Sequence, residues 1–219
     1  QTFEAWEART GQRILERYGM SETMMNTSNP LVGERVAGTV GFALPGTDVR
    51  VADSEGRVLG ADEVGVLEVR GPNVFSGYWR MPEKNAEEFR SDGFFITGDL
   101  GRIDAGGRVT IVGRAKDLII SGGYNVYPKE VEERLDELPG VAESAVIGIP
   151  HPDFGEAVVA VLVPTGDPVS EHDVRAALAD RLARFKQPKT VINVPTLPRN
   201  AMGKVQKKVL RETYMNLFG

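Results

Sequence analysis

The chain of 219 residues contains no cysteine and only two histidines, His151 and His172. The absence of cysteine excludes disulfide bonds, a thiol nucleophile and thiolate metal sites. Two isolated histidines are too few for a histidine-based metal site or a catalytic triad. The sequence also has no phosphate-binding loop of the GxxxxGKS or GxxxxGKT type.

The sequence lacks the marks of a membrane-associated or nucleic-acid-binding protein. No uninterrupted apolar run approaches the length of a membrane span, and acids stand where a secretory signal needs an apolar core. The formal net charge is -5, and no basic stripe accompanies Phe75, Tyr78 and Trp79, which we interpret as packing residues. We therefore expect no nucleic acid and no membrane as partner, and a cytoplasmic location.

What is present is the composition of an ordinary globular protein, with 41% hydrophobic and 26% charged residues. Such a chain can build a sizeable core in one large domain or two small ones. Residues 3–17 carry apolar side chains near helical spacing, which predicts a helix that ends before Tyr18. Residues 36–112 are predicted to be β-rich, and the turn sequence at 104–107 predicts a hairpin between residues 100–103 and 108–112.

The pattern changes after Asp117. The expected elements are a charged amphipathic helix over 128–138, strands over 144–149 and 157–163, a helix capped by Ser170, a strand over 190–194 and a last helix over 205–218. This order indicates a small α/β unit that covers one face of a short sheet. We therefore expect an α+β protein with a β-rich part, residues 1–116, and a small α/β domain with flanking helices, residues 117–219.

Residues 18–23 read YGMSET and follow the first predicted helix. Gly19 beside the aromatic Tyr18 would let the backbone approach a flat ligand such as adenine. The hydroxyl of Ser21 suits a phosphate oxygen, and the carboxylate of Glu22 is a hard oxygen ligand that suits magnesium. The alternative is an ordinary helix-to-loop junction with a solvated carboxylate.

Three further charged residues lie at or after the predicted hairpin. Asp99, in the triplet TGD, suits two adjacent sugar hydroxyls, although such a triplet is also typical of a turn. Arg114 carries planar donors that suit ribose or phosphate, or it is a surface charge at a strand end. Asp117 stands where the composition changes and is a hinge candidate.

Two loops of the second half contain the remaining candidates. Gly122 and Gly123 precede Tyr124, and two glycines let the backbone touch an extended ligand, unless the segment is only a flexible loop. Lys204 follows a glycine in a loop rich in turn-forming residues. It is either a solvated surface group or a mobile ammonium that meets developing negative charge in an active site.

Together, the order and spacing of these motifs resemble the adenylate-forming enzymes, in their acyl-CoA synthetase branch, over essentially the whole chain. Residues 24–30 (MMNTSNP) and 33–41 (GERVAGTVG) are most similar to malonyl-CoA and methylmalonyl-CoA synthetases. The resemblance implies a two-step reaction that uses ATP, Mg2+ and coenzyme A. A small carboxylate attacks the α-phosphorus of ATP to give acyl-AMP and pyrophosphate, and the thiol of coenzyme A then displaces AMP.

The resemblance also implies a role for each candidate residue. In the first step, Tyr18 and Gly19 would line the adenine pocket, Ser21 would contact phosphate, Glu22 would bind magnesium, and Asp99 with Arg114 would hold the ribose hydroxyls. Lys204 would contact the reacting carboxylate and the α-phosphate. In the second step, Gly122, Gly123 and Tyr124 would border the pantetheine path. The small domain would rotate about Asp117 between the steps and exchange the Lys204 loop for the glycine loop.

Lys204 is also an expected modification site. Lysines in this loop are acylation targets in the wider family, and acetylation removes the positive charge. The resemblance therefore implies reversible acetylation of Lys204 as an off-switch, with a protein lysine acetyltransferase and deacetylase as partners.

The sequence departs from the family in three ways. Ser21 stands where many relatives have threonine, and Ala201 and Met202 stand where many have hydroxyl residues. The family's upstream phosphate loop, most of its large N-terminal domain and most of the acyl pocket are missing, so we expect a fragment that is inactive by itself. Two alternatives stay open: an adenylation domain that loads a carrier protein, and a non-catalytic fragment that serves as an acetyltransferase substrate.

Overall fold

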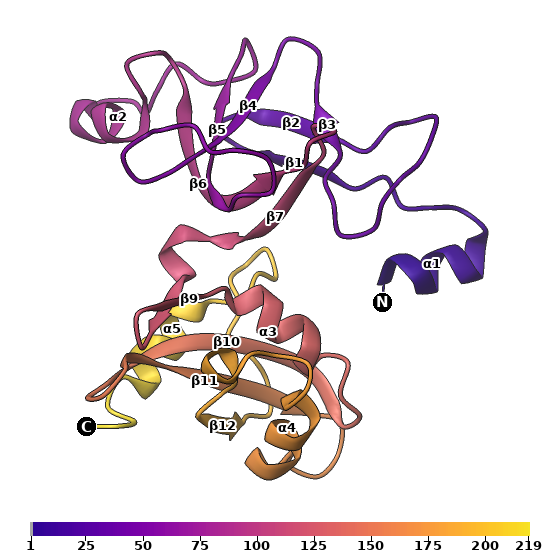
Figure 1. Ribbon diagram of the computed structural model, residues 1–219, viewed down its shortest axis with the longest axis vertical. Helices are drawn as coiled ribbons and strands as arrows, with labels where there is room; N and C mark the ends of the chain where they lie inside the picture. Colours follow the sequence, from indigo (N-terminus) through magenta and orange to yellow (C-terminus); the bar gives the residue numbers. More distant parts are fainter. Residues whose placement is uncertain (1) are drawn as a thin grey trace. The chain divides into compact units, whose positions relative to one another are not determined.

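The computed structural model describes residues 2–219, and the chain divides into two compact units. Unit 1 is Gln1–Ala115 and unit 2 is Lys116–Gly219. Figure 1 shows the helices and strands of each unit along the chain. Sheets and helices occur in both, which confirms the predicted α+β class. No helix of the described residues is long and apolar enough to cross a membrane.

Unit 1 is mainly β-structure. Its elements are α1 (Thr2–Thr10), β1 (Arg17–Met20), β2 (Met24–Ser28), β3 (Phe42–Ala43), β4 (Asp48–Ala52), β5 (Gly65–Arg70), α2 (Pro82–Glu88), β6 (Phe95–Ile103) and β7 (Val109–Arg114). The strands form a three-stranded sheet, β1-β2-β3, and a four-stranded sheet, β4-β5-β6-β7, with antiparallel neighbours throughout. The predicted hairpin is confirmed, because β6 and β7 pair in antiparallel fashion. Asp104 accepts the backbone N–H groups of the intervening turn.

The predicted helix over residues 3–17 was wrong in its second half. α1 ends at Thr10, and Gly11 follows with φ +67°, a left-handed conformation that commonly ends helices. Residues 17–20 instead form β1, which pairs with β2. Ile14 and Leu15, which suggested helical spacing, belong to the segment without regular structure that leads into β1. The YGMSET segment therefore lies on the end of β1 and on the turn that leads into β2.

Unit 2 is an α/β unit. After a short 3-10 helix (Ala115–Asp117), its elements are β8 (Ile119–Ser121), β9 (Tyr124–Val126), α3 (Pro128–Leu135), β10 (Val141–His151), β11 (Gly155–Pro164), α4 (Glu171–Leu178), a second 3-10 helix (Arg184–Lys186), β12 (Thr190–Asn193) and α5 (Lys207–Tyr214). β11 pairs with β10 and β8 in antiparallel fashion and with β12 in parallel. Ser170 caps α4 as expected, because its hydroxyl accepts the N–H of Asp173.

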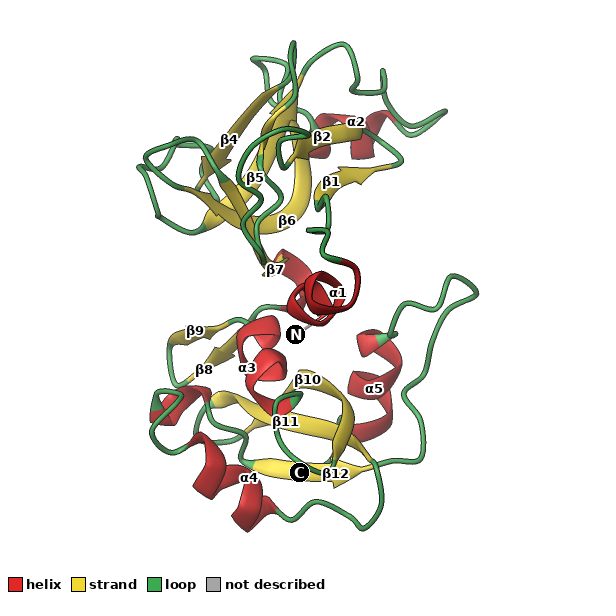
Figure 2. Ribbon diagram, turned by 90° about the vertical axis from the view of Figure 1, so that its right-hand side faces the viewer, coloured by secondary structure: helices red, strands yellow, loops and turns green. Residues whose placement is uncertain are grey.

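Helices cover both faces of this sheet, so the prediction of cover on one face was wrong. α3 and α4 pack on one face, against side chains such as Val146 and Val158, and α5 packs on the other, against Ile147 and Val159. Figure 2 shows α3 and α5 on opposite sides of β10 and β11. The reason is visible in the strands themselves. Residues 157–163 are apolar without interruption, which is typical of a strand buried on both faces.

Candidate functional site

Three strands of unit 1 meet at the carboxylate of Asp99. Tyr18, on β1, donates a hydrogen bond from Oη to Oδ2 of Asp99 at 2.6 Å. Arg114, on β7, pairs its Nε with Oδ1 of Asp99 at 2.6 Å, and the two residues face each other in the β6–β7 register. The structure therefore brings together three residues that the sequence suggested separately, and we name them the Asp99 cluster.

The Asp99 cluster is a buried anion with a fixed donor on each side. The side chain of Asp99 is 7% exposed, whereas that of Arg114 is 45% exposed. Burial, and then the adjacent charge of Asp99, raise the pKa of Tyr18, so its phenol stays a donor at neutral pH. Because a carboxylate offers about four lone-pair positions, Asp99 keeps acceptor capacity for further hydroxyl donors.

Gly19 has a structural reason to be glycine. The β1–β2 pairing shifts register between Tyr18 and Gly19, and a Cβ atom at Gly19 would lie 1.9 Å from the carbonyl oxygen of Met24. The close approach that the sequence suggested for a flat ligand is thus made by the neighbouring strand. Such a bulge re-aims the adjacent side chains, here that of Tyr18 toward Asp99.

Glu22 and Ser21 lie in the turn between β1 and β2. Oε1 of Glu22 accepts a hydrogen bond from Oη of Tyr78 at 3.1 Å, and its backbone carbonyl accepts the N–H of Phe75. Burial, and then the carboxylates of Glu88 and Glu22, raise the pKa of Tyr78, which keeps this phenol protonated. Ser21 is exposed. The arrangement orients the Glu22 carboxylate, and among residues 2–219 no hydrogen bond or ion pair engages its second oxygen.

The donor set decides how a metal would fit at Glu22. Within residues 2–219, no group of three or more His, Cys, Asp or Glu side chains is placed to hold a metal ion. Mg2+ at nucleotides is typically held by one or two carboxylates together with phosphate oxygens and water. Glu22 fits magnesium only in this way, as a single carboxylate beside bound phosphates.

In unit 2, Gly122 and Gly123 form the two-residue turn between β8 and β9. Their φ values are +59° and +82°, and positive φ at both central residues is typical of a tight hairpin turn. A Cβ atom at Gly123 would meet nothing within 4 Å, so the backbone there is open. The glycines are therefore required by the turn itself, and they also leave an uncovered stretch of backbone beside Tyr124.

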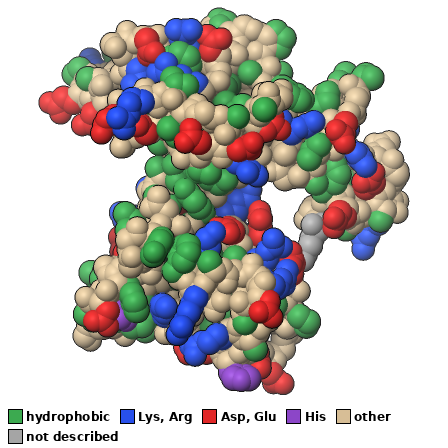
Figure 3. Space-filling view, in the orientation of Figure 1, with side chains coloured by type: hydrophobic (Ala, Val, Ile, Leu, Met, Phe, Trp, Pro, Cys, Tyr) green, Lys and Arg blue, Asp and Glu red, His purple; other side chains and the backbone are tan. Residues whose placement is uncertain are grey.

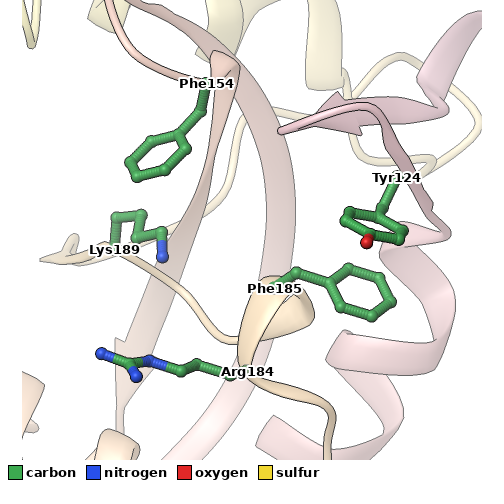
Figure 4. Close-up of a pocket in the computed structure, with 5 residues that line it drawn as sticks. All are labelled: Tyr124, Phe154, Arg184, Phe185 and Lys189. Atoms are coloured by element: carbon green, nitrogen blue, oxygen red, sulfur yellow. The ribbon is translucent and has the colours of Figure 1, made fainter.

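Tyr124 opens onto a pocket of about 490 Å3 that four other side chains complete, namely Phe154, Arg184, Phe185 and Lys189. The rings of Tyr124 and Phe185 are stacked, with centroids 4.7 Å apart, and Nζ of Lys189 lies 4.8 Å from the centroid of Phe154 (Figure 4). Figure 3 shows hydrophobic and basic side chains next to one another on the visible face of unit 2. We name this feature the Tyr124 pocket.

The sequence reasoning missed four of the five residues of the Tyr124 pocket. The segment 184–189 reads RFKQPK, in which an aromatic residue stands between basic residues, and this signal was available. Phe154 had no such signal, because only the tertiary fold places the β10–β11 turn beside β8. Flat aromatic faces beside cations favour a planar, negatively charged ligand.

Lys204 lies in a tightly bonded turn. Oδ1 of Asn200 accepts the backbone N–H groups of Met202 and Lys204, at 3.0 and 2.9 Å, and Gly203 has φ +79°. The turn is fixed to β10, because Arg199 donates to the carbonyl of Gly203 and pairs with Glu143. Within the described residues, no hydrogen bond or ion pair involves the exposed Lys204 ammonium. The backbone of the turn is therefore ordered and the cation is free.

Asp117 ends the first 3-10 helix and is bound within unit 2. Its Oδ1 accepts a hydrogen bond from Nη1 of Arg211, on α5, at 2.9 Å. Both side chains are partly buried. The residue that the sequence suggested as a hinge is thus held by an ion pair to the last helix.

Comparison with known proteins gives consistent matches over both units. The family model described as "AMP-binding enzyme" matches residues 1–79, and that described as "AMP-binding enzyme C-terminal domain" matches residues 130–204. The chain is 42% identical to malonate–CoA ligase of Arabidopsis thaliana and 39% identical to mitochondrial malonate–CoA ligase of Mus musculus, in each case over 96% of this chain. Among solved structures, ATP-bound MatB from Rhodopseudomonas palustris matches all of the chain with a TM-score of 0.96 and 60% identity.

The matches cover only part of those proteins. The chain spans 36% of the Arabidopsis ligase, 40% of the mouse ligase and 44% of the MatB chain.

Proposed function

The chain belongs to the AMP-binding enzymes, in their acyl-CoA synthetase branch, and on this premise we propose that the whole protein is an acid–thiol ligase. It activates a small dicarboxylate, malonate or methylmalonate, as acyl-AMP and transfers the acyl group to coenzyme A. The choice of acid is supported by the malonate–CoA ligases and by MatB among the relatives. The observation that carries the proposal is the Asp99 cluster.

The Asp99 cluster is suited to the nucleoside of ATP. A buried carboxylate with free lone pairs accepts the two adjacent hydroxyls of ribose, and Arg114 offers further planar donors to the same ligand. The ring of Tyr18, fixed by its bond to Asp99, lies at the edge of the same site and borders adenine together with Gly19. Ser21 contacts a phosphate oxygen, and Glu22 holds the magnesium ion, which neutralises phosphate charge.

The free cation of Lys204 is suited to the first step. When the carboxylate oxygen bonds to the α-phosphorus and pyrophosphate leaves, negative charge concentrates between two anionic reactants. An ammonium brought to that point stabilises the transition state, and loss of one such donor typically costs about 3–4 kcal/mol. The thiol step does not need this cation, because the thiol of coenzyme A attacks the uncharged carbonyl carbon of the acyl group and AMP leaves.

The Tyr124 pocket is suited to coenzyme A. Its stacked aromatic rings offer a platform for a base, and Arg184 and Lys189 offer charges to phosphates. The open backbone at Gly123 leaves a path for the pantetheine arm beside the pocket. Between the two steps, residues 117–219 rotate about Asp117 as a domain and exchange the Lys204 turn for the β8–β9 turn.

The test uses the whole protein with magnesium ATP, coenzyme A and a panel of carboxylic acids, and identifies acyl-CoA by mass. We expect malonyl-CoA or methylmalonyl-CoA from the wild type. Lys204→Ala should lower the adenylation rate about 100- to 1,000-fold and spare attack of coenzyme A on supplied acyl-AMP. Lys208→Ala, an exposed lysine on α5, is the matched control and should change neither half-reaction.

Three results would contradict parts of the proposal. An equal loss in both half-reactions of Lys204→Ala contradicts the role of the lysine. Acyl-CoA from a different acid keeps the ligase activity and discards the dicarboxylate. Release of AMP without acyl-CoA from any acid indicates a carrier protein as the acyl acceptor.

A further inference from the structure

We propose that Glu156 is a positioning residue for the β8–β9 turn, and that through this turn it sets the rate at which coenzyme A attacks acyl-AMP. The inference rests on the proposed function. Glu156 does not line the Tyr124 pocket, and within residues 2–219 no hydrogen bond joins its side chain to the turn glycines. It acts by holding the strand from which both are built.

β8 shares a short register with β11. Its register with β11 consists of the pair Gly155 and Ser121. Next to that pair, the backbone N–H of Ile120 donates to Oε2 of Glu156 at 2.8 Å, and the N–H of Gly122 donates to the carbonyl oxygen of Phe154 at 2.8 Å. A side-chain carboxylate thus replaces the strand-to-strand hydrogen bond that the ladder does not supply at Ile120.

Gly148 on β10 leaves space for the Glu156 carboxylate. Glu156 lies on β11, and a Cβ atom at Gly148 on the neighbouring β10 would stand 2.7 Å from Oε1 of Glu156. The same Cβ would stand 3.1 Å from Cγ2 of Ile119. A side chain at position 148 would push the end of the Glu156 side chain aside, so glycine there leaves the carboxylate in its place beside Ile120.

The core holds the base of the β8–β9 hairpin through the buried side chains of Ile119 and Val126, and the Glu156 hydrogen bond lies nearer to the turn. β8 and β9 contain three residues each, and a hairpin of this size has little stability of its own. Its outer strand carries Tyr124, which is 59% exposed and reaches the rest of unit 2 by stacking on Phe185. A shift of β8 therefore moves both the open backbone at Gly123 and one wall of the Tyr124 pocket. Misplacement of a substrate-positioning group by about 1 Å can lower a rate about 100-fold.

The experiment compares Glu156→Ala, Glu156→Gln and the wild type in the whole protein. Glu133→Ala is the control, because Glu133 is an exposed glutamate on α3. Three quantities are measured: amide hydrogen exchange at Ile120, pyrophosphate exchange into ATP, and acyl-CoA formation from supplied acyl-AMP at varied coenzyme A. For Glu156→Ala we expect faster exchange at Ile120 and a kcat/KM for coenzyme A lower by about 10- to 100-fold. Pyrophosphate exchange should stay within about twofold of the wild type. Glu156→Gln keeps an acceptor oxygen and should restore most of the thioester-forming rate.

Two results overturn the inference alone. One is an unchanged thioester-forming rate in Glu156→Ala despite faster exchange at Ile120. The other is an equal loss in both half-reactions, which would indicate a general loss of structure. Failure of the proposed function is recognised separately, because a wild type that makes no acyl-CoA from supplied acyl-AMP overturns both before any variant is compared.

Discussion

Tyr18 donates a hydrogen bond to Asp99 at 2.6 Å across 81 positions of the chain. The bond joins β1 of the three-stranded sheet to β6 of the four-stranded sheet, so it links the two sheets of unit 1. Since Arg114 engages the other oxygen of the same carboxylate, Asp99 is held from both sides in one orientation.

Tyr18→Phe should weaken nucleotide binding. The variant keeps the ring and removes one hydrogen bond to a charged group, an interaction typically of about 1.5–3 kcal/mol. We expect KM for ATP to rise about tenfold, measured by steady-state kinetics of the whole protein. Tyr214→Phe, at a partly buried tyrosine that packs against the core of unit 2, is the control. An unchanged KM for ATP would mean that the bond is structural only.

The phenol of Tyr18 should make unit 1 sensitive to alkali. Its pKa is raised in the folded protein, chiefly by burial and then by Asp99, so the folded state favours the protonated form. The resulting stabilisation is fully present below about pH 10, the ordinary tyrosine pKa, and is lost as pH rises through the folded pKa. In an absorbance titration, Tyr18→Phe should remove one late-ionising phenol. Loss of an early-ionising phenol instead would contradict the burial of Tyr18.

Glu68→Ala should strongly destabilise unit 1. The side chain of Glu68 is fully buried and pairs with Arg50 and Arg90, each at 2.8 Å. Removing Glu68 takes the carboxylate partner from Arg90, whereas Arg50 keeps its ion pair with Asp92. Breaking a buried pair typically costs about 3–5 kcal/mol, and we expect the lower end because both arginines are partly exposed. Urea unfolding followed by tryptophan fluorescence measures this, since Trp6 and Trp79 both lie in unit 1.

The control for Glu68 is Glu55→Ala. Glu55 forms an exposed ion pair with Arg57, and such pairs contribute about 0–1 kcal/mol. Equal destabilisation by the two substitutions would show that burial of Glu68 does not determine its importance.

Asn200→Ala should impair adenylation through the Lys204 turn. The substitution removes the acceptor of two backbone N–H groups, those of Met202 and Lys204. With the turn loosened, the lysine reaches the reacting atoms less often, and we expect adenylation to slow about tenfold while the thioester step is unchanged. Asn200→Asp keeps the acceptor oxygen and should retain most of the rate. A loss confined to the thioester step would contradict this role.

Phe185→Ala should raise KM for coenzyme A. The substitution removes one ring of the stacked pair in the Tyr124 pocket. Stacking of a base on an aromatic side chain is typically worth about 1–3 kcal/mol, so we expect an increase of about tenfold or more. KM for ATP serves as the internal control and should not change. A rise in KM for ATP alone would remove the pocket from coenzyme A binding.

Local sequence signals predicted the β-rich first part, the β6–β7 hairpin and the capped helix α4 correctly. They failed at residues 11–17, where apolar spacing suggested a helix and Gly11 ended it. They failed again at the sheet of unit 2, where the last helix was expected but its packing on the second face of the sheet was not. Gly122 and Gly123 were expected to contact an extended ligand or to form a flexible loop, and the structure places them in a tight turn with positive φ.

The sequence by itself determined the residue types available for chemistry and the absence of cysteine. It also determined those helices and strands that hydrophobic periodicity or turn residues within the segment predict. Only the tertiary structure decided that Tyr18, Asp99 and Arg114 share one carboxylate, because strand register sets contacts between distant residues. The tertiary structure likewise assembled the Tyr124 pocket and brought Glu156 to Ile120. These contacts depend on which strands pair and which glycines leave room, and neither can be read from spacing along the chain.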